Sequence, residues 1–209
     1  MLKIGLTGGI ASGKSAVGEM FVRLGARLIQ SDAVARELMQ PGQKPYAEVV
    51  ARFGRDILDT DGSINRARLA ESAFGSSGQS NPRVKELNAI VHPAVIAKEN
   101  EWMREVGRRD PTAIVIVEAA LILESGALDR FDDLIVVICH PEQRIARYSK
   151  RHGLSEQAAR AEVARRMAAQ LSDEEKIKAA DFVIDNSGPV EATEIEVRKI
   201  FSKLKAKSA

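Results

Sequence analysis

The sequence predicts an α/β fold in which helices are wound on both faces of a five-stranded parallel sheet. Five short apolar segments alternate with helical patterns along the 209 residues. These segments are rich in Ile and Val and mostly lack strict polar alternation, which is typical of strands buried on both faces. A glycine-rich loop follows the first segment directly and precedes a helical pattern. The expected strands are Leu2–Thr7, Arg27–Gln30, Ala113–Glu118, Asp133–Cys139 and Phe182–Asp185.

The glycine-rich loop fits G-x-x-x-x-G-K-[ST], the phosphate-binding loop of P-loop NTPases. Glycines let successive backbone N–H groups turn toward phosphate oxygens, and the helix N-terminus adds partial positive charge. A lysine in the loop reaches the β- and γ-phosphates and the final hydroxyl can ligate Mg²⁺. The alternative is a plain glycine-rich turn, which the strand–loop–helix setting disfavours. The expected nucleotide-binding residues are Gly8, Gly9, Ile10, Ala11, Ser12, Gly13, Lys14 and Ser15.

Composition excludes several other classes of protein. There are 31 basic and 29 acidic residues, a net charge of +2, which is too balanced for a dedicated nucleic-acid or membrane-surface binder. The aromatic content of 4% argues against a stacking platform for single-stranded nucleic acid. The single Cys139 lies in an apolar run and is expected in the core, without a disulfide. We expect a cytoplasmic protein with no nucleic-acid or membrane partner.

Two stretches interrupt the regular alternation of strands and helices. About eighty residues separate the second strand from the third, more than one crossover helix requires. We interpret residues 41–109 as a helical substrate-side insertion, in which His92-Pro93 breaks one helix and starts another and residues 75–80 form a surface loop. Residues 151–170 are interpreted as a helical lid. The core of this single domain is then 1–40, 110–150 and 171–209.

Two carboxylates come directly after predicted strands. Asp32 follows the second strand and Glu118 closes the third, so both are expected at the sheet edge that carries the phosphate loop. A carboxylate there can activate an attacking hydroxyl or hold Mg²⁺, directly or through water. The alternative for Asp32 is a helix N-cap, and the alternative for Glu118 is a solvated strand end.

Arginines gather after the fourth strand. Arg144, Arg147 and Arg151 follow Pro141 and are separated from one another by three and four residues, which places them on one stripe of a helix. Arg165 and Arg166 come later, in the expected lid. Guanidiniums that face a transferring phosphoryl group would neutralise its charge. The alternative is a solvated face with ion pairs to Glu142 or Glu162.

The order and spacing of short motifs along nearly the whole chain resemble the dephospho-CoA kinase family. The opening Ile4–Ser15 is similar to that family's phosphate loop, with a double glycine after Thr7. Asp32-Ala33-Val34-Ala35-Arg36 is similar to its Asp-x-x-x-Arg segment. The further matches are Pro41-Gly42, Asp61-Gly62, Arg66, His92-Pro93, Leu121–Glu124, Arg147, Arg151, Gln170, Lys176, Ala180-Asp181 and Asp185-Asn186. The sequence departs from the family at Gln30-Ser31, where an acidic residue is common, at Ala119-Ala120, where proline is common, and at His140.

The resemblance implies transfer of the γ-phosphoryl group of ATP, with Mg²⁺, to the ribose 3′-hydroxyl of dephospho-CoA. It implies catalytic roles for Lys14, Asp32 and Arg147, and Mg²⁺ bound at Ser15 with Asp32 or Glu118 acting through water. It adds Asn186 to the ATP-binding residues, and it implies that Asp32, Arg36, His92 and Glu118 bind the acceptor. The implied lid contacts to phosphate are Arg144, Arg147, Arg151 and Arg166.

Two alternative functions would use the same phosphate-binding loop. Another small-molecule kinase would need a different insertion, and a nucleotide-switch GTPase would need an Asn-Lys-x-Asp-like segment after the fourth strand, which we do not find. A kinase needs an acceptor to release ADP, whereas a switch does not. We expect a monomer, with an oligomer as the alternative.

Overall fold

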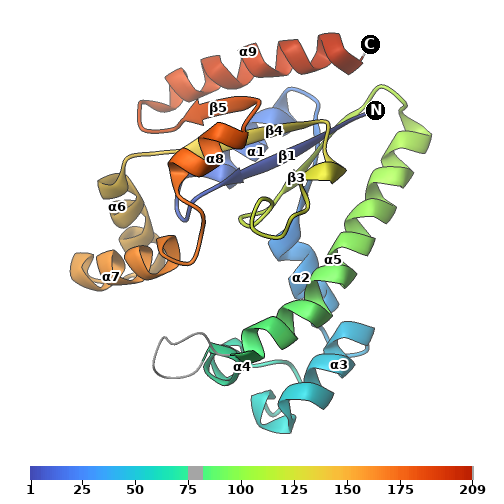
Figure 1. The fold of residues 1–209 in the computed structure, drawn as a ribbon, viewed down its shortest axis with the longest axis vertical. Helices are drawn as coiled ribbons and strands as arrows, with labels where there is room; N and C mark the ends of the chain where they lie inside the picture. The colour runs from blue at the N-terminus through green and yellow to red at the C-terminus, as the bar shows by residue number, and fades with distance from the viewer. Residues whose placement is uncertain (75–81, 209) are drawn as a thin grey trace. The chain divides into compact units, whose positions relative to one another are not determined.

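A computed structural model describes residues 1–74 and 82–208 of the chain (Figure 1). The residues divide into two compact units. The sheet unit comprises residues 1–30 and 105–209, and the helical unit comprises residues 31–104. The surface loop expected at residues 75–80 lies outside the described residues.

The sheet unit contains the expected five parallel strands, in the order β2-β3-β1-β4-β5. β1 therefore lies at the centre, and the loop that follows it emerges between the carboxyl ends of its neighbours. The strands are β1 (Leu2–Gly8), β2 (Arg27–Gln30), β3 (Ile114–Glu118), β4 (Asp133–Ile138) and β5 (Phe182–Asp185). The helical segments are α1 (Lys14–Arg23), η2 (Leu128–Arg130), α6 (Pro141–His152), α7 (Glu156–Met167), α8 (Asp173–Ala179) and α9 (Val190–Ser208).

Alternate residues of β4 supply the two faces of the sheet. Ile135 and Val137 belong to a cluster with buried residues of α1 and α9. Leu134 and Val136 belong to a second cluster with Ile122 and the segment after β3. Apolar side chains on both faces explain why the strands lack a polar alternation. All of β3 is buried, which fits its place inside the sheet.

Cys139 follows β4 and lies in the core, as expected. It is a free cysteine with 5% of its surface exposed. Burial raises the pKa of its thiol, because the thiolate would lose water.

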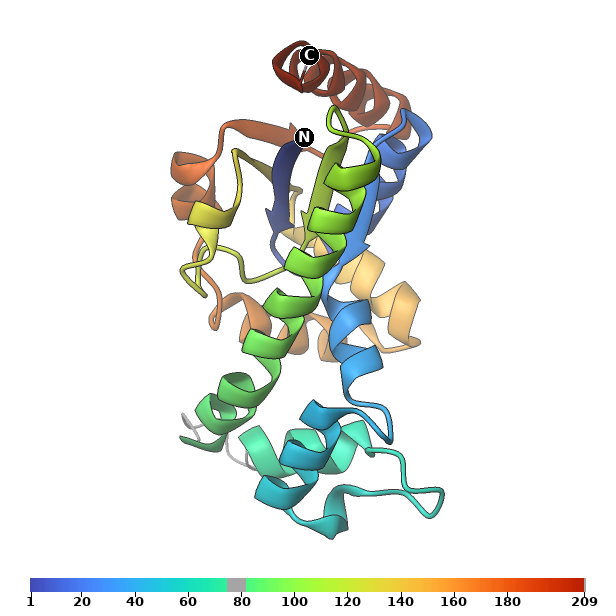
Figure 2. The same cartoon turned by 90° about the vertical axis from the view of Figure 1, so that its right-hand side faces the viewer.

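The helical unit contains α2 (Ser31–Leu38), α3 (Lys44–Phe53), η1 (Arg55–Ile57), α4 (Arg66–Phe74) and most of α5 (Pro82–Arg109). The expected break at His92-Pro93 is wrong, because α5 continues through Pro93. Figure 2 shows α5, in green, as one continuous helix. Proline removes one helical hydrogen bond and costs about 3 kcal/mol inside a helix. Val91 and Val95 on either side of it are buried, and this packing offsets the local cost.

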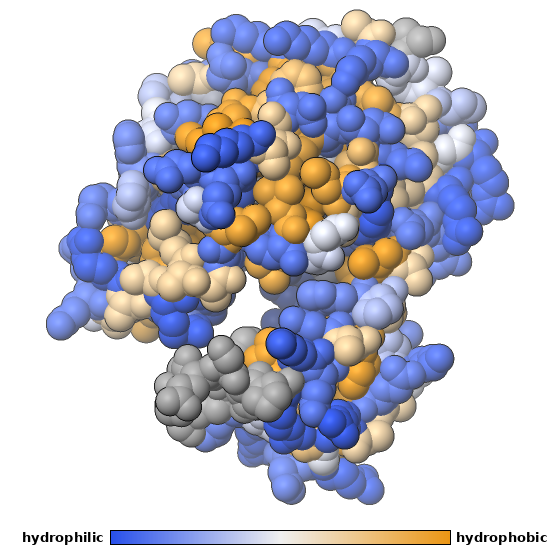
Figure 3. Space-filling model, in the orientation of Figure 1, coloured by the Kyte–Doolittle hydropathy of each residue, from blue (hydrophilic) through white to orange (hydrophobic). Residues whose placement is uncertain are grey.

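Hydrophilic side chains cover most of the face seen in Figure 3, with apolar side chains gathered on the sheet unit. Within the described ranges, no helix combines the length and the apolarity that crossing a bilayer requires.

Candidate active site

The phosphate loop has a strained conformation. β1 ends at Gly8 and α1 begins at Lys14, so the loop lies at the carboxyl end of the central strand. Gly13 precedes α1 with φ 96°, and Ala11 has φ 54°. A left-handed backbone costs a residue with a Cβ about 1–2 kcal/mol. Strain of this kind collects where a loop must present backbone groups to a ligand, which fits a phosphate cradle.

Side chains from outside the loop pack directly on two of its glycines. A Cβ added to Gly9 would overlap Nη1 of Arg144, and one added to Gly13 would overlap Nδ2 of Asn186. Both neighbours lie far away in the sequence, after β4 and β5. The motif glycines therefore serve the packing around the loop as well as its conformation.

The lysine and serine that end the motif contact different partners. Nζ of Lys14 donates to the carbonyls of Gly8 at 2.9 Å and Gly9 at 3.1 Å, so the ammonium lies over the loop. Oγ of Ser15 donates to Oε1 of Glu118 at 2.6 Å. This bond joins the first turn of α1 to the end of β3, and it places Glu118 at the edge of the sheet that carries the phosphate loop.

Glu118 is held from two sides. Nε2 of Gln30 donates to its other oxygen, Oε2, at 3.0 Å. Gln30 and Glu118 are also partners in the β2–β3 register. Glu118 is only 8% exposed, so the alternative of a solvated strand end is wrong.

Ser15 and Glu118 provide the hard oxygen donors that Mg²⁺ prefers. Residues 1–74 and 82–208 contain no group of three or more His, Cys, Asp or Glu residues that could hold a metal alone. Mg²⁺ in kinase sites is commonly held by one or two protein oxygens, with phosphates and water completing the shell. The pair therefore fits an ion that arrives with a nucleotide.

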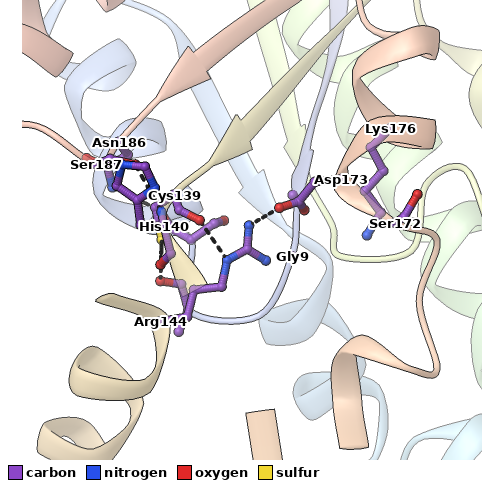
Figure 4. A network of polar contacts seen from close by, with 12 residues as sticks. Gly9, Cys139, His140, Arg144, Ser172, Asp173, Lys176, Asn186 and Ser187 are labelled. Carbon is purple, nitrogen blue, oxygen red and sulfur yellow. Dashed lines mark hydrogen bonds and ion pairs between the residues drawn. The ribbon is translucent and has the colours of Figure 1, made fainter. Parts of the chain in front are cut away.

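Arg144 lies on α6 and points toward the loop and α8 (Figure 4). Its side chain is 1% exposed. Nε donates to the Cys139 carbonyl at 3.1 Å, and Nη2 forms an ion pair with Asp173. Nη1, which faces Gly9, has no hydrogen-bond partner in the described part of the chain. The expected contact of Arg144 with phosphate stays a prediction.

Arg147, one turn later on α6, contacts the back of the loop. Nη1 donates to the Ser12 carbonyl at 3.2 Å, and Nη2 donates to the Asn186 carbonyl at 2.9 Å. The Asn186 side chain also binds Ser12, because its Nδ2 donates to the same carbonyl at 2.9 Å. The structure thus brings three predicted site residues together. Their contacts here are with protein groups, and their roles toward ATP stay predictions.

The expected lid contains α7, which packs against α6 and the phosphate loop. Ile10 and Ala11 of the loop lie against a cluster that includes Tyr148 of α6 and Val163 of α7. Because of these contacts, a change in the position of α7 would alter the packing of the phosphate loop.

Arg165 and Arg166 form ion pairs within α7. Arg165 and Arg166 both contact Glu162, at 2.7 Å and 2.6 Å. Hydrogen bonds from Arg165, and then from Arg166, lower the pKa of Glu162 to about 2. This is the ion-paired alternative that the sequence allowed. Arg151 is exposed at the end of α6. Phosphate contacts of Arg151 and Arg166 stay predictions.

The other predicted acceptor residues belong to the helical unit. Asp32 is the second residue of α2, and Arg36 lies in the last turn of that helix; both are exposed. His92 is half-buried in α5. Since α2 begins at Ser31, Asp32 is not the N-cap, and among the described residues its carboxylate makes no hydrogen bond to the backbone. Its part in catalysis stays a prediction.

Sequence reasoning missed two contacts at this site. Asp173 was not singled out, although it follows Ser172, whose side chain forms a capping box with Glu175 at the start of α8. Thr193, whose hydroxyl binds Asn186, was also missed. A capping box can be read from a sequence, but the partner that a buried arginine selects cannot.

Similarity to known proteins identifies the family of this chain. The family model described as dephospho-CoA kinase matches residues 2–192. The dephospho-CoA kinase of Corynebacterium efficiens is 41% identical over 205 residues, which cover 98% of both chains. A crystal structure from Thermus thermophilus has a TM-score of 0.77 at 30% identity, with 97% of both chains covered. The dephospho-CoA kinase of Campylobacter jejuni has a TM-score of 0.60 at 25% identity, with 97% and 96% covered. The chain belongs to the dephospho-CoA kinase family.

Proposed function

We propose that this chain transfers the γ-phosphoryl group of ATP to the ribose 3′-hydroxyl of dephospho-CoA, the last step of coenzyme A synthesis, with Mg²⁺ as cofactor. The observation that carries the proposal is the phosphate loop whose Ser15 is bound to the buried Glu118, in a chain that matches the kinase family along its length.

Each proposed role follows from the chemistry of a side chain. The ammonium of Lys14 binds the β- and γ-phosphates in exchange for the loop carbonyls that it now contacts. The guanidinium of Arg147 stabilises the loop and the charge of the transferring group. The carboxylate of Asp32 accepts the proton of the attacking hydroxyl. Bound Mg²⁺ would neutralise charge on the phosphates, held at Ser15 and near Glu118.

The remaining parts of the proposal rest on the family resemblance. Arg36 and His92 bind the acceptor, and Arg144, Arg151 and Arg166 contact phosphate when both substrates are present. We also propose that the protein acts as a monomer in the cytoplasm.

The test is ADP release with ATP and Mg²⁺, measured with and without dephospho-CoA, with the product identified by mass. We expect release only with the acceptor, and a product heavier by one phosphoryl group. Lys14→Ala is the control and should lose about 10²–10³ in kcat while keeping its fold. ADP release at the same rate without dephospho-CoA would favour a nucleotide switch and contradict the proposal.

A further inference from the structure

Thr193 is a buried hydroxyl on an otherwise apolar helix face. It is 0% exposed, and the other buried residues of α9 are Val197, Ile200 and Leu204, all in the main core cluster. A buried hydroxyl costs free energy unless it is hydrogen-bonded, and valine would fill the same volume without that cost. The position of the hydroxyl therefore calls for an explanation beyond packing.

The hydroxyl of Thr193 orients the amide of Asn186. Oγ1 of Thr193 donates to Oδ1 of Asn186 at 3.0 Å, and both residues are buried. With its oxygen turned to Thr193, the amide presents Nδ2 to the Ser12 carbonyl at 2.9 Å. A flipped amide would bring two oxygens together at Ser12, so the Ser12 carbonyl selects this orientation and the Thr193 hydroxyl holds the other end of the amide in place.

The Ser12 carbonyl in turn fixes a peptide of the phosphate loop. It accepts from Asn186 and from Nη1 of Arg147, at 2.9 Å and 3.2 Å. In a trans peptide the C=O and the following N–H point in opposite directions, and no cis peptide occurs among the described residues. The N–H of Gly13 therefore points away from Asn186 and Arg147. Backbone N–H groups of this loop are the donors that bind phosphate.

We propose that Thr193 is a positioning residue for the phosphate loop, acting through the Asn186 amide and the Ser12 carbonyl on the direction of the Gly13 N–H. Thr193 itself need not touch the nucleotide. This inference rests on the proposed function in one respect, that the loop binds the phosphates of ATP. It adds a residue on α9 to the groups that set ATP affinity.

The test is the Kd for ATP, measured by calorimetry, in Thr193→Val. Losing one net hydrogen bond that orders the loop should weaken ATP binding about three- to tenfold. The KM for dephospho-CoA should not change. Thr193→Ser keeps the hydroxyl and should restore ATP binding. The matched control is Ile200→Val, a small core deletion on the same helix, which should lower Tm without changing the Kd for ATP.

A double-mutant cycle separates positioning from packing. In an Asn186→Ala background the hydroxyl has no amide to orient, so Thr193→Val should cause no further loss of ATP affinity. Thr193→Ala replaces the valine variant if that variant does not fold. A wild-type Kd in the hydroxyl-free variant, or an equal loss with and without Asn186, would overturn the inference. Turnover of the wild-type protein tests the proposed function separately, because the ratio of two ATP affinities does not depend on the acceptor.

Discussion

The hydroxyl of Ser15 and the carboxylate of Glu118 are joined by a 2.6 Å hydrogen bond between the first turn of α1 and the end of β3. Gln30 holds the second carboxylate oxygen at 3.0 Å. The carboxylate is thus fixed by two neutral donors and is itself buried, whereas Ser15 is exposed. This oxygen-rich position beside the phosphate loop is where we propose that Mg²⁺ binds, and its negative charge comes from Glu118.

Glu118→Gln should raise the Mg²⁺ concentration needed for half-maximal activity. The amide keeps the shape and an oxygen for Ser15 but removes the negative charge. Changes to groups that support a metal commonly cost about 10–100-fold in metal affinity. The measurement is activity and ATP binding against Mg²⁺ concentration. Glu19→Gln, an exposed carboxylate on α1, is the control. An unchanged Mg²⁺ dependence would show that Glu118 does not contribute to Mg²⁺ binding.

Asp32→Asn should lower kcat by about 10²–10⁴, with smaller changes in the KM of either substrate. Asparagine keeps the size of the side chain but cannot accept the proton of the attacking hydroxyl. Steady-state kinetics and a melting curve together decide the result. If kcat is retained and Tm falls, the carboxylate serves the start of α2 through the helix dipole and has no catalytic part.

The strands could be predicted because their signal is local. Short runs such as Arg27–Gln30 and Phe182–Asp185 were placed with the bounds that the structure has. The helix through Pro93 could not be predicted in this way. A His-Pro pair signals a break locally, but burial of neighbouring valines keeps α5 continuous.

The site was predictable where a motif names it. The loop, Lys14, Ser15 and Glu118 follow from a pattern with a known mechanism and from the position of strand ends. The partners of the arginines were not predictable. Arg144 pairs with Asp173, and Arg147 with the Ser12 carbonyl, across 29 and 135 residues of sequence. A stripe of arginines on a solvated helix face would have the same sequence pattern.

Arg147→Lys should lower kcat and weaken ATP binding together. Arg147 donates to two carbonyls, on Ser12 and Asn186, from two different nitrogens. A lysine ammonium cannot reproduce this planar contact, so we expect a loss of about tenfold or more, and a larger loss in Arg147→Ala. Kinetics with ATP varied at saturating dephospho-CoA would measure kcat and the KM for ATP. Arg198→Lys, at an exposed position of α9, is a comparison for the general effect of replacing an arginine with lysine. If Arg147→Ala has the kinetics of the wild type, Arg147 has no role in ATP binding or turnover and serves the structure only.

Acid should weaken the contribution of Glu162 to stability. Its hydrogen bonds with Arg165 and Arg166 lower its pKa from 4.5 to about 2 in the folded chain. Between these values the unfolded chain binds a proton that the folded chain does not, so unfolding is favoured as the pH falls. The stabilisation is complete above pH 4.5 and is lost progressively toward pH 2. Glu162→Gln should therefore have a lower Tm than the wild type at pH 7, and the difference should shrink at pH 3. Glu19→Gln, at an exposed position in the interior of α1, is the comparison variant. A Tm difference for Glu162→Gln that stays constant between pH 7 and pH 3 would show that the ion pairs do not stabilise α7.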